Sequence, residues 1–221
     1  MIKIFLLLIS FPFTGSAQQK KQAVEKRWSI SVSPGIVPVP GKPGSVQPGI
    51  EFFFNAQFSL LNEIGLQTAK NNDFDSTALN KKYFKYKAEL RYYIGENTIR
   101  PYFGLQFTTA KRKFNVGKPN KYYELFQDDS IYTYDKASIN SPIVTATVQF
   151  GISFRVVTDF YFDLSTGYGA RFVDTEYTSL VNLQKNRNVG FFNIKPISSY
   201  RYTGKLTRSQ FNLGLRFSYR F

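Results

Sequence analysis

Hydrophobic residues recur at every second position along several stretches of the chain. In the clearest stretch, 211–221, phenylalanine, leucine and tyrosine occupy the odd positions, and polar residues or glycine occupy the even positions. Successive side chains of a β-strand point to opposite faces, so this pattern predicts a strand with one apolar and one polar face. The same alternation predicts three more such strands at 84–94, 144–156 and 160–172.

Less regular alternation brings the number of predicted strands to eight, and an even number suits a closed antiparallel barrel. The four clear strands have the ~9–11 residues that a tilted strand needs to cross a bilayer. The third strand breaks the pattern, because Leu61 falls on its polar face and Asn62 on its apolar face. The four less regular segments are 28–39, 47–54, 58–68 and 100–113.

The connections between these segments alternate strictly between short and long. Outer-membrane barrels have short periplasmic turns and long extracellular loops, and a first strand that starts from the periplasm would place every short turn on the inner side. The sequence therefore predicts an all-β fold, an eight-stranded antiparallel up-and-down transmembrane β-barrel over 27–221. The short links lie near 55–57, 95–97 and 157–159, and the long links at 40–46, 71–81, 115–140 and 176–206.

A soluble barrel of lipocalin type is the alternative, since its strands also alternate. In that fold the apolar face would line the interior, whereas in a membrane barrel the charged face would do so. The alternation of short and long links favours the membrane barrel, as do a signal peptide at the start of the chain and the terminal phenylalanine, both described below. The residues then expected inside are Lys85, Lys87, Glu89, Arg91, Arg155, Asp163, Arg171, Arg216 and Arg220.

The first residues have the features of a secretory signal peptide. Lys3 supplies a positive charge, an apolar run follows over 4–13, and small residues precede Ala17. The apolar run is well short of the ~20 residues of a membrane-spanning helix. We expect a cleaved signal peptide at 1–17, a periplasmic N-terminal segment at 18–26, and a location in a Gram-negative outer membrane.

The composition excludes several kinds of chemistry. The chain has no cysteine and no histidine, which removes disulfides, thiolate metal sites, and the usual general base and metal ligand. We therefore expect no enzyme, no cofactor and no metal. The net charge of +14 is one feature of nucleic-acid binders, but export argues against that class of partner. The phosphates of outer-leaflet lipid are the expected acidic partner.

The chain also resembles known outer-membrane proteins. Phe217, Tyr219 and Phe221, with apolar residues at alternate positions upstream, resemble the C-terminal β-signal of that class. The resemblance implies delivery by periplasmic chaperones and insertion by the BAM machinery. The mature chain is similar to uncharacterised small outer-membrane β-barrel proteins of Bacteroidota, and in plan to the OmpA and OmpX barrels. This likeness lies in the segments 87–94, 100–105 and 163–171.

Three groups of residues are candidates for a function. The inward Glu51, Glu63, Glu89 and Asp163 are predicted to be counter-ions in a narrow lumen, with a catalytic carboxylate pair as the alternative. The tyrosine-rich link 115–140 suits protein recognition. Basic residues at the predicted outer rim are candidates for contact with lipopolysaccharide phosphates, with plain solvated charge as the alternative. These are Lys111, Arg112, Lys113, Lys185, Arg187, Lys195, Arg201, Lys205 and Arg208.

Together these features predict a non-enzymatic protein with a structural or loop-mediated binding role in the outer membrane. The alternative is an accessory subunit of a secretion or assembly complex, because one related branch, the PorT-like proteins, is linked to type IX secretion. A narrow pore and a lipid-modifying enzyme are weaker hypotheses. An eight-stranded barrel is only just wide enough for its own side chains, so bulky inward residues are expected to leave little open channel.

Overall fold

The computed structural model describes residues 27–34, 45–67, 78–95, 98–117, 123–127, 130–186 and 203–221. The predicted signal peptide at 1–17 and the predicted segment at 18–26 lie outside the described residues. No helix among the described residues is long and apolar enough to cross a membrane. The strands are β1 (Trp28–Pro34), β2 (Ser45–Phe53), β3 (Phe58–Gln67), β4 (Ala78–Tyr93), β5 (Ile99–Gly117), β6 (Tyr123–Gln127), β7 (Ser130–Tyr134), β8 (Lys136–Val157), β9 (Phe160–Val181), β10 (Gln184–Asn186) and β11 (Gly204–Arg220).

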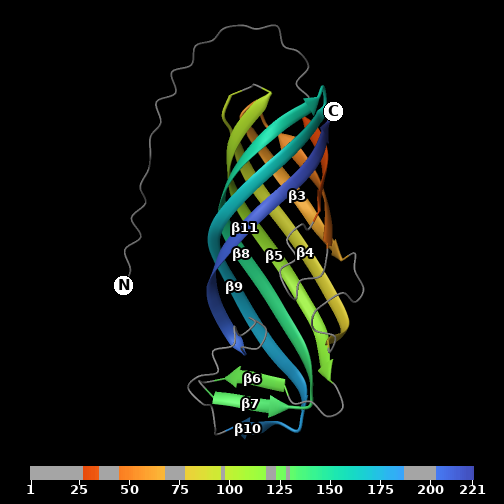
Figure 1. The fold of residues 1–221 in the computed structure, drawn as a ribbon, viewed down its shortest axis with the longest axis vertical. Coiled ribbons are helices and arrows are strands. Elements are labelled where there is room, and N and C mark those ends of the chain that lie inside the picture. The colour runs from red at the N-terminus through yellow and green to blue at the C-terminus, as the bar shows by residue number, and fades with distance from the viewer. Residues whose placement is uncertain are drawn as a thin grey trace, which may run out of the picture.

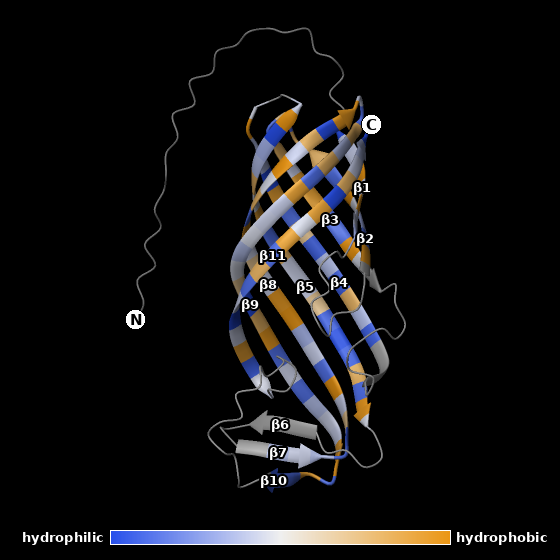
Figure 2. Ribbon diagram, viewed as in Figure 1, coloured by the Kyte–Doolittle hydropathy of each residue, from blue (hydrophilic) through white to orange (hydrophobic). Residues whose placement is uncertain are grey.

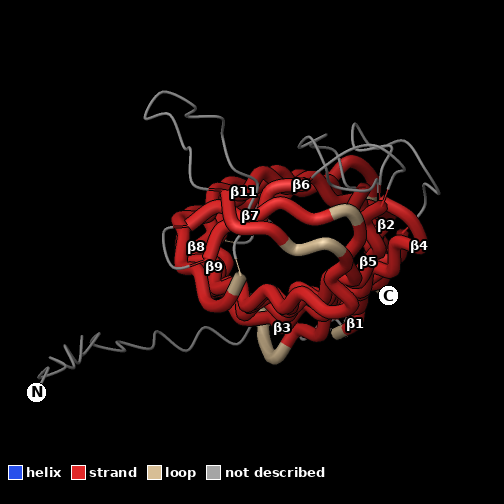
Figure 3. The backbone as a smooth tube through the Cα atoms, turned by 90° about the horizontal axis from the view of Figure 1, so that it is seen from below, coloured by secondary structure: helices blue, strands red, loops and turns tan. Residues whose placement is uncertain are grey.

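Eight of these strands form a closed antiparallel barrel, which confirms the predicted fold. Around the barrel the order is β1, β2, β3, β4, β5, β8, β9 and β11, so each strand pairs with its predecessor in the barrel. Figure 3 shows the ring seen end-on. The ring closes where β11 returns to β1, with Ser29 opposite Arg220 and Val32 opposite Phe217. Beyond this seam of four residue pairs, the Phe221 amide donates to the Trp28 carbonyl at 2.9 Å.

The short connections lie at one end of the barrel, which we call the turn end, together with Trp28 and Phe221 (Figure 1). They occupy 54–57, 94–98 and 158–159, as the sequence predicts. We call the opposite end the loop end. There, β6, β7 and β10 form a separate three-stranded sheet in the order β10-β7-β6, which lies across the end of the barrel in Figure 1.

The prediction of two long loops at 115–140 and 176–206 is therefore partly wrong. Strand β5 continues to Gly117, β8 already begins at Lys136, and β9 continues to Val181. The connection from β5 to β8 contains the hairpin β6–β7, and the connection from β9 to β11 contains the short strand β10. Backbone pairing thus extends well past the point at which the outward face stops being apolar.

The outward faces of the strands change character along the barrel. On β5 the outward side chains are apolar from Ile99 to Phe107, and Leu105 is 62% exposed. Towards the loop end the same face presents Lys111 and Lys113. On β9 the outward Phe172 is likewise followed by Asp174 and Glu176, and Figure 2 shows apolar and polar residues alternating along these strands.

The height of the apolar band follows from strand geometry. The apolar stretch of β8 from Val144 to Val156 spans roughly 28 Å at a rise of about 3.3 Å per residue and a tilt of about 45°. This value is close to the apolar band of about 25 Å in outer-membrane barrels. By the same geometry, β5 and β8 continue about 15–20 Å beyond the band towards the loop end.

The irregular third strand has a structural explanation. Leu61 points into the barrel and is fully buried (0% exposed), and Asn62 points outward. On the outer face, the Tyr86 hydroxyl donates to the Asn62 side-chain oxygen at 2.6 Å. The polar side chain on the apolar face thus has a hydrogen-bond partner. The inward Leu61 and outward Asn62 agree with the register read from the sequence.

Candidate functional site

The middle of the lumen is crossed by a network of buried ion pairs that centres on Arg216 of β11. Its guanidinium contacts the Glu51 carboxylate at 3.0 Å, and its Nε donates to Asp163 Oδ2 at 2.8 Å. Arg91 Nη1 donates to the same Asp163 oxygen at 3.0 Å, and Arg91 Nε donates to Glu89 at 2.8 Å. Strands on opposite sides of the ring are thereby tied together through the lumen.

The other carboxylates of the lumen are also paired. Lys87 forms an ion pair with Glu63, which also accepts a hydrogen bond from Ser33 at 2.7 Å. Glu51 accepts from the Ser59 hydroxyl at 2.6 Å and from the Tyr93 hydroxyl at 2.8 Å. An unpaired charge in such a buried place would cost several kcal/mol, so each contact offsets a desolvation penalty.

Aromatic rings and arginines fill the lumen between this network and the turn end. The Arg91 guanidinium lies 4.6 Å from the centre of the Tyr102 ring, and that of Arg100 lies 4.5 Å from the Tyr93 ring. The Arg220 guanidinium lies 3.9 Å from the Phe53 ring. These side chains, held by cation–π contacts, occupy the lumen towards the turn end.

A glycine provides the space for one of these rings. Gly151 of β8 lies directly opposite Tyr102 of β5. A Cβ atom at residue 151 would lie far inside van der Waals contact of the Tyr102 ring. The absence of a side chain at this position therefore lets the tyrosine ring lie across the lumen.

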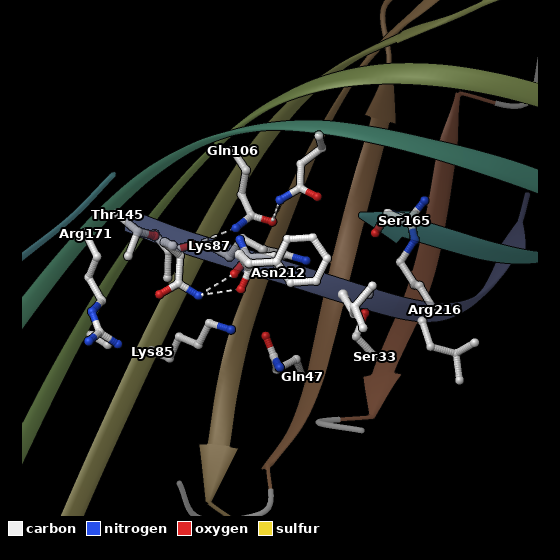
Figure 4. A pocket seen from close by; sticks show the side chains of 18 of the residues that line it. Ser33, Gln47, Lys85, Lys87, Gln106, Thr145, Ser165, Arg171, Asn212 and Arg216 are labelled. Carbon is white, nitrogen blue, oxygen red and sulfur yellow. Dashed lines mark hydrogen bonds between the residues drawn. The ribbon is translucent and has the colours of Figure 1, made fainter. Parts of the chain in front are cut away.

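A cavity of about 350 Å³ occupies the lumen on the loop side of the ion-pair network. The inward residues are expected to leave little open channel, and this cavity is the space that they leave on the loop side. Figure 4 shows side chains from several strands around the cavity, with Lys85, Lys87 and Arg171 reaching towards it. The charged residues that line it are Lys85, Lys87, Arg91, Arg112, Arg171, Arg216 and Asp163, so cations greatly outnumber carboxylates.

The structure divides the predicted basic rim into three groups. Lys111, Lys113, Lys185 and Lys205 are exposed on the outside. Arg112 is not part of the rim, because it lines the cavity and donates to Ser141 Oγ at 3.1 Å. Arg208 also lies on the inward face of β11. The remaining three, Arg187, Lys195 and Arg201, lie outside the described residues.

The sheet at the loop end has a small core of its own. Tyr134 is buried against Ala137, and its ring centre lies 5.7 Å from that of Tyr177. The Asp135 amide donates to the Val181 carbonyl at 3.0 Å, which joins the two predicted loops. Tyr134 thus has a packing role, and recognition of a protein by this tyrosine-rich segment stays a prediction.

Among the described residues, no group of three or more histidine, cysteine, aspartate or glutamate side chains could hold a metal ion. The carboxylates at 51, 63, 89 and 163 each contact an arginine or a lysine instead. These contacts are those of counter-ions, and they favour the structural interpretation of the four carboxylates over a catalytic pair.

Comparison with known proteins gives distant structural likenesses. The crystal structure of Neisserial surface protein A is 12% identical over 88% of this chain and 95% of that chain, with a TM-score of 0.36. Acinetobacter baumannii CarO is 9% identical over 91% of this chain and 100% of that chain, with a TM-score of 0.42. A major outer membrane protein from Thermus thermophilus is 11% identical over 88% and 98%, with a TM-score of 0.39. No protein-family model and no curated protein matches the chain.

Proposed function

We propose that this chain is an integral outer-membrane protein without enzymatic activity, which holds a folded loop-end platform away from the lipid for binding. The observation that carries the proposal is the outward apolar band. Around the barrel, large side chains such as Tyr168 (65% exposed) and Leu213 would face water in a soluble protein, and contiguous apolar surface of that extent is rare in soluble monomers. Lipid is the solvent that suits this surface.

Aromatic side chains at the turn end support the same proposal. Trp28 packs on Phe52 with ring centres 4.7 Å apart, and Phe58 packs on Tyr92 at 5.0 Å. Such outward aromatic rings at the edge of an apolar band form the girdles that fix the depth of a barrel in the membrane. The three residues of the proposed insertion signal, Phe217, Tyr219 and Phe221, are also exposed on this outer face.

The outer edge of the band supports contact with lipopolysaccharide at two of the predicted residues. Lys111 and Lys113 follow the apolar stretch of β5 directly and point outward, at the level where headgroup phosphates would lie. Lys205 lies opposite Asp174 in the register, and a nearby carboxylate weakens its case as a phosphate ligand. We therefore assign the contact to Lys111 and Lys113.

The contacts in the interior count against a through-channel and against a hydrolytic site. The ion-pair network crosses the middle of the lumen, and aromatic rings lie between it and the turn end. The carboxylates that a glycosidase-type pair would need are held by arginine and lysine. This arrangement therefore favours a binding role for the loop end, outside the barrel.

Membrane insertion can be tested directly because the chain contains no cysteine. Single substitutions Leu105→Cys and Lys113→Cys place one thiol inside the proposed band and one above it, on the same face of the same strand. In intact cells, a membrane-impermeant maleimide should label the thiol at 113 and leave the thiol at 105 unlabelled until detergent is added. Equal labelling of both positions would refute the membrane-embedded band.

A partner at the loop end can be sought by pull-down of the tagged protein from its own outer membrane in mild detergent. A protein recovered at fixed stoichiometry would favour the accessory-subunit alternative, in the sense of the PorT-like branch. Recovery of lipopolysaccharide alone, lost on Lys111→Gln and Lys113→Gln but kept on Lys185→Gln, would favour an autonomous barrel. The likeness to barrels of Bacteroidota and the use of chaperones and the BAM machinery stay predictions.

A further inference from the structure

Three lysines gather on the outer wall of the barrel where the apolar band ends. Lys82 of β4 lies directly opposite Lys113 of β5, and Lys111 lies opposite Phe84, the next outward residue of β4. All three lysines are exposed, and Phe84 is 53% exposed. Side chains two residues apart lie on the same face of a strand, so the three lysines share the outward face. We call Lys82, Lys111 and Lys113 the lysine cluster.

The three ammonium groups can meet around one small anion. Residues directly opposite in an antiparallel pair have Cβ atoms about 4.5–5.5 Å apart, which applies to Lys82 and Lys113. Lys111 precedes Lys113 by two positions on the same strand, a separation of roughly 6.8 Å. Each lysine carries its charge on a flexible four-carbon stem, and these spacings are within the combined reach of two such side chains. The backbone therefore does not need to move for all three to contact one group.

The lysine cluster carries a repulsion that the described residues do not offset. Like charges directly opposite each other destabilise a sheet. No side-chain hydrogen bond or ion pair joins any of the three lysines to a described residue. The outward carboxylates Asp174 and Glu176 are on β9, and β8 lies between β9 and β5, so about 10 Å separates them from the cluster in the sheet. An anion held between the lysines would remove the repulsion.

The level of the lysine cluster indicates that this anion is the headgroup of a lipid. On β4 the outward residues from Tyr92 to Phe84 are aromatic or aliphatic, and Lys82 is the first charged one. On β5 the outward apolar run ends at Phe107, and Lys111 is the first charged outward residue. Lysine stems can lie along apolar surface while the ammonium groups meet the headgroups. The inference thus rests on the membrane insertion proposed above, and it specifies the kind of lipid.

The charge of the lysine cluster favours a phosphate monoester over a phosphodiester. A monoester carries a charge of about −1.5 to −2 near neutral pH and three terminal oxygens, whereas a diester carries a single negative charge. Three ammonium groups can donate charge-assisted hydrogen bonds to those three oxygens. We propose that the lysine cluster is a binding site for an outer-leaflet lipid that bears a phosphate monoester. Lys82 and Lys113 hold the phosphate from either side, and Lys111 is the third donor.

The test is lipid binding to the purified full chain in detergent micelles, measured by native mass spectrometry. The probes are phosphatidic acid, whose headgroup is a phosphate monoester, and phosphatidylglycerol with the same acyl chains, whose phosphate is a diester. The first molecule of phosphatidic acid should bind about fivefold more tightly than that of phosphatidylglycerol. Lys82→Gln should weaken binding of phosphatidic acid about fivefold, the effect of one lysine at an anionic lipid surface, and Lys82→Arg should retain it. Lys205→Gln removes the same charge from the outer face of β11 and should leave the affinity unchanged.

Each other outcome is decisive. Equal affinity for the two lipids would overturn the assignment of a monoester. Equal weakening by Lys82→Gln and Lys205→Gln would show only the attraction of anionic lipid to a basic protein, and would overturn the site. An unchanged affinity in Lys82→Gln would overturn it as well. Failure of membrane insertion would appear instead as equal maleimide labelling of the thiols at 105 and 113, a measurement that leaves Lys82 in place, so the two proposals can fail separately.

Discussion

The substitution Asp163→Asn gives a sharp test of the ion-pair network. The Oδ2 atom of Asp163 accepts from Arg91 Nη1 at 3.0 Å and from Arg216 Nε at 2.8 Å. Removal of this charge leaves two buried guanidinium groups with weakened partners. Removing one partner of a buried pair typically costs about 3–5 kcal/mol, so we expect a loss of that size in the free energy of unfolding.

The assay is urea unfolding of the chain folded in detergent micelles. Far-ultraviolet circular dichroism reports the strands, and the fluorescence of the single tryptophan, Trp28, reports the turn end. Asp174→Asn is the matched control, because it makes the same change on the outward face of the same strand, where it should alter stability by at most about 1 kcal/mol. A loss from Asp163→Asn no larger than that of the control would refute the structural role of the network.

Three further outcomes are expected. Gly151→Ala should lower the free energy of unfolding by about 1–3 kcal/mol, because the new Cβ would overlap the Tyr102 ring. The loss should be smaller when Tyr102 is also replaced by leucine. An unchanged denaturation midpoint for Gly151→Ala would contradict the close approach of the two residues. Tyr86→Phe should lower the free energy of unfolding by about 1 kcal/mol, because Asn62 loses this hydrogen bond, and adding Asn62→Leu should restore it. Equal stability of the wild type and Tyr86→Phe would mean that this hydrogen bond does not stabilise the barrel. Planar bilayers with the wild-type chain should show no steady current, because rings and ion pairs fill the turn half of the lumen; regular current steps would contradict this.

Much of the barrel could be predicted from the sequence, because the outward and inward faces of its strands carry side chains of opposite polarity. Every strand within the apolar band was predictable by period two, including β3, where Leu61 and Asn62 looked misplaced and are in fact oriented as the register requires. The short turns and the inward position of the carboxylates followed from the same alternation.

The loop half could not be predicted in the same way. Past the band the alternation continues with its polarity reversed. On β5 the inward Ala110 and Val116 are buried while the outward Lys111 is exposed, and on β8 the inward Ala137 and Ile139 are buried. An outward apolar face therefore no longer marks the strands there. Strands β6, β7 and β10 form a separate sheet, so the alternation imposed by the barrel does not apply to them.

The inward position of Arg112 could nevertheless have been predicted. It lies two residues after Ala110 and four after Thr108, both of which point inward, and side chains two residues apart lie on the same face of a strand. The cavity itself depends on side-chain volumes around the ring, which no local pattern encodes.

The seam between β1 and β11 has a consequence for how the protein is made. These two strands are far apart in the sequence, and among the described residues they share four residue pairs plus the contacts of Trp28 and Phe221. Closing so long a loop for so few hydrogen bonds carries the largest entropic cost of any pairing in the barrel, so the seam should be the last to form. Until then the protein is an open sheet with two unpaired edges, the state most prone to aggregation. Biogenesis must therefore shield those edges up to the moment at which the ring closes.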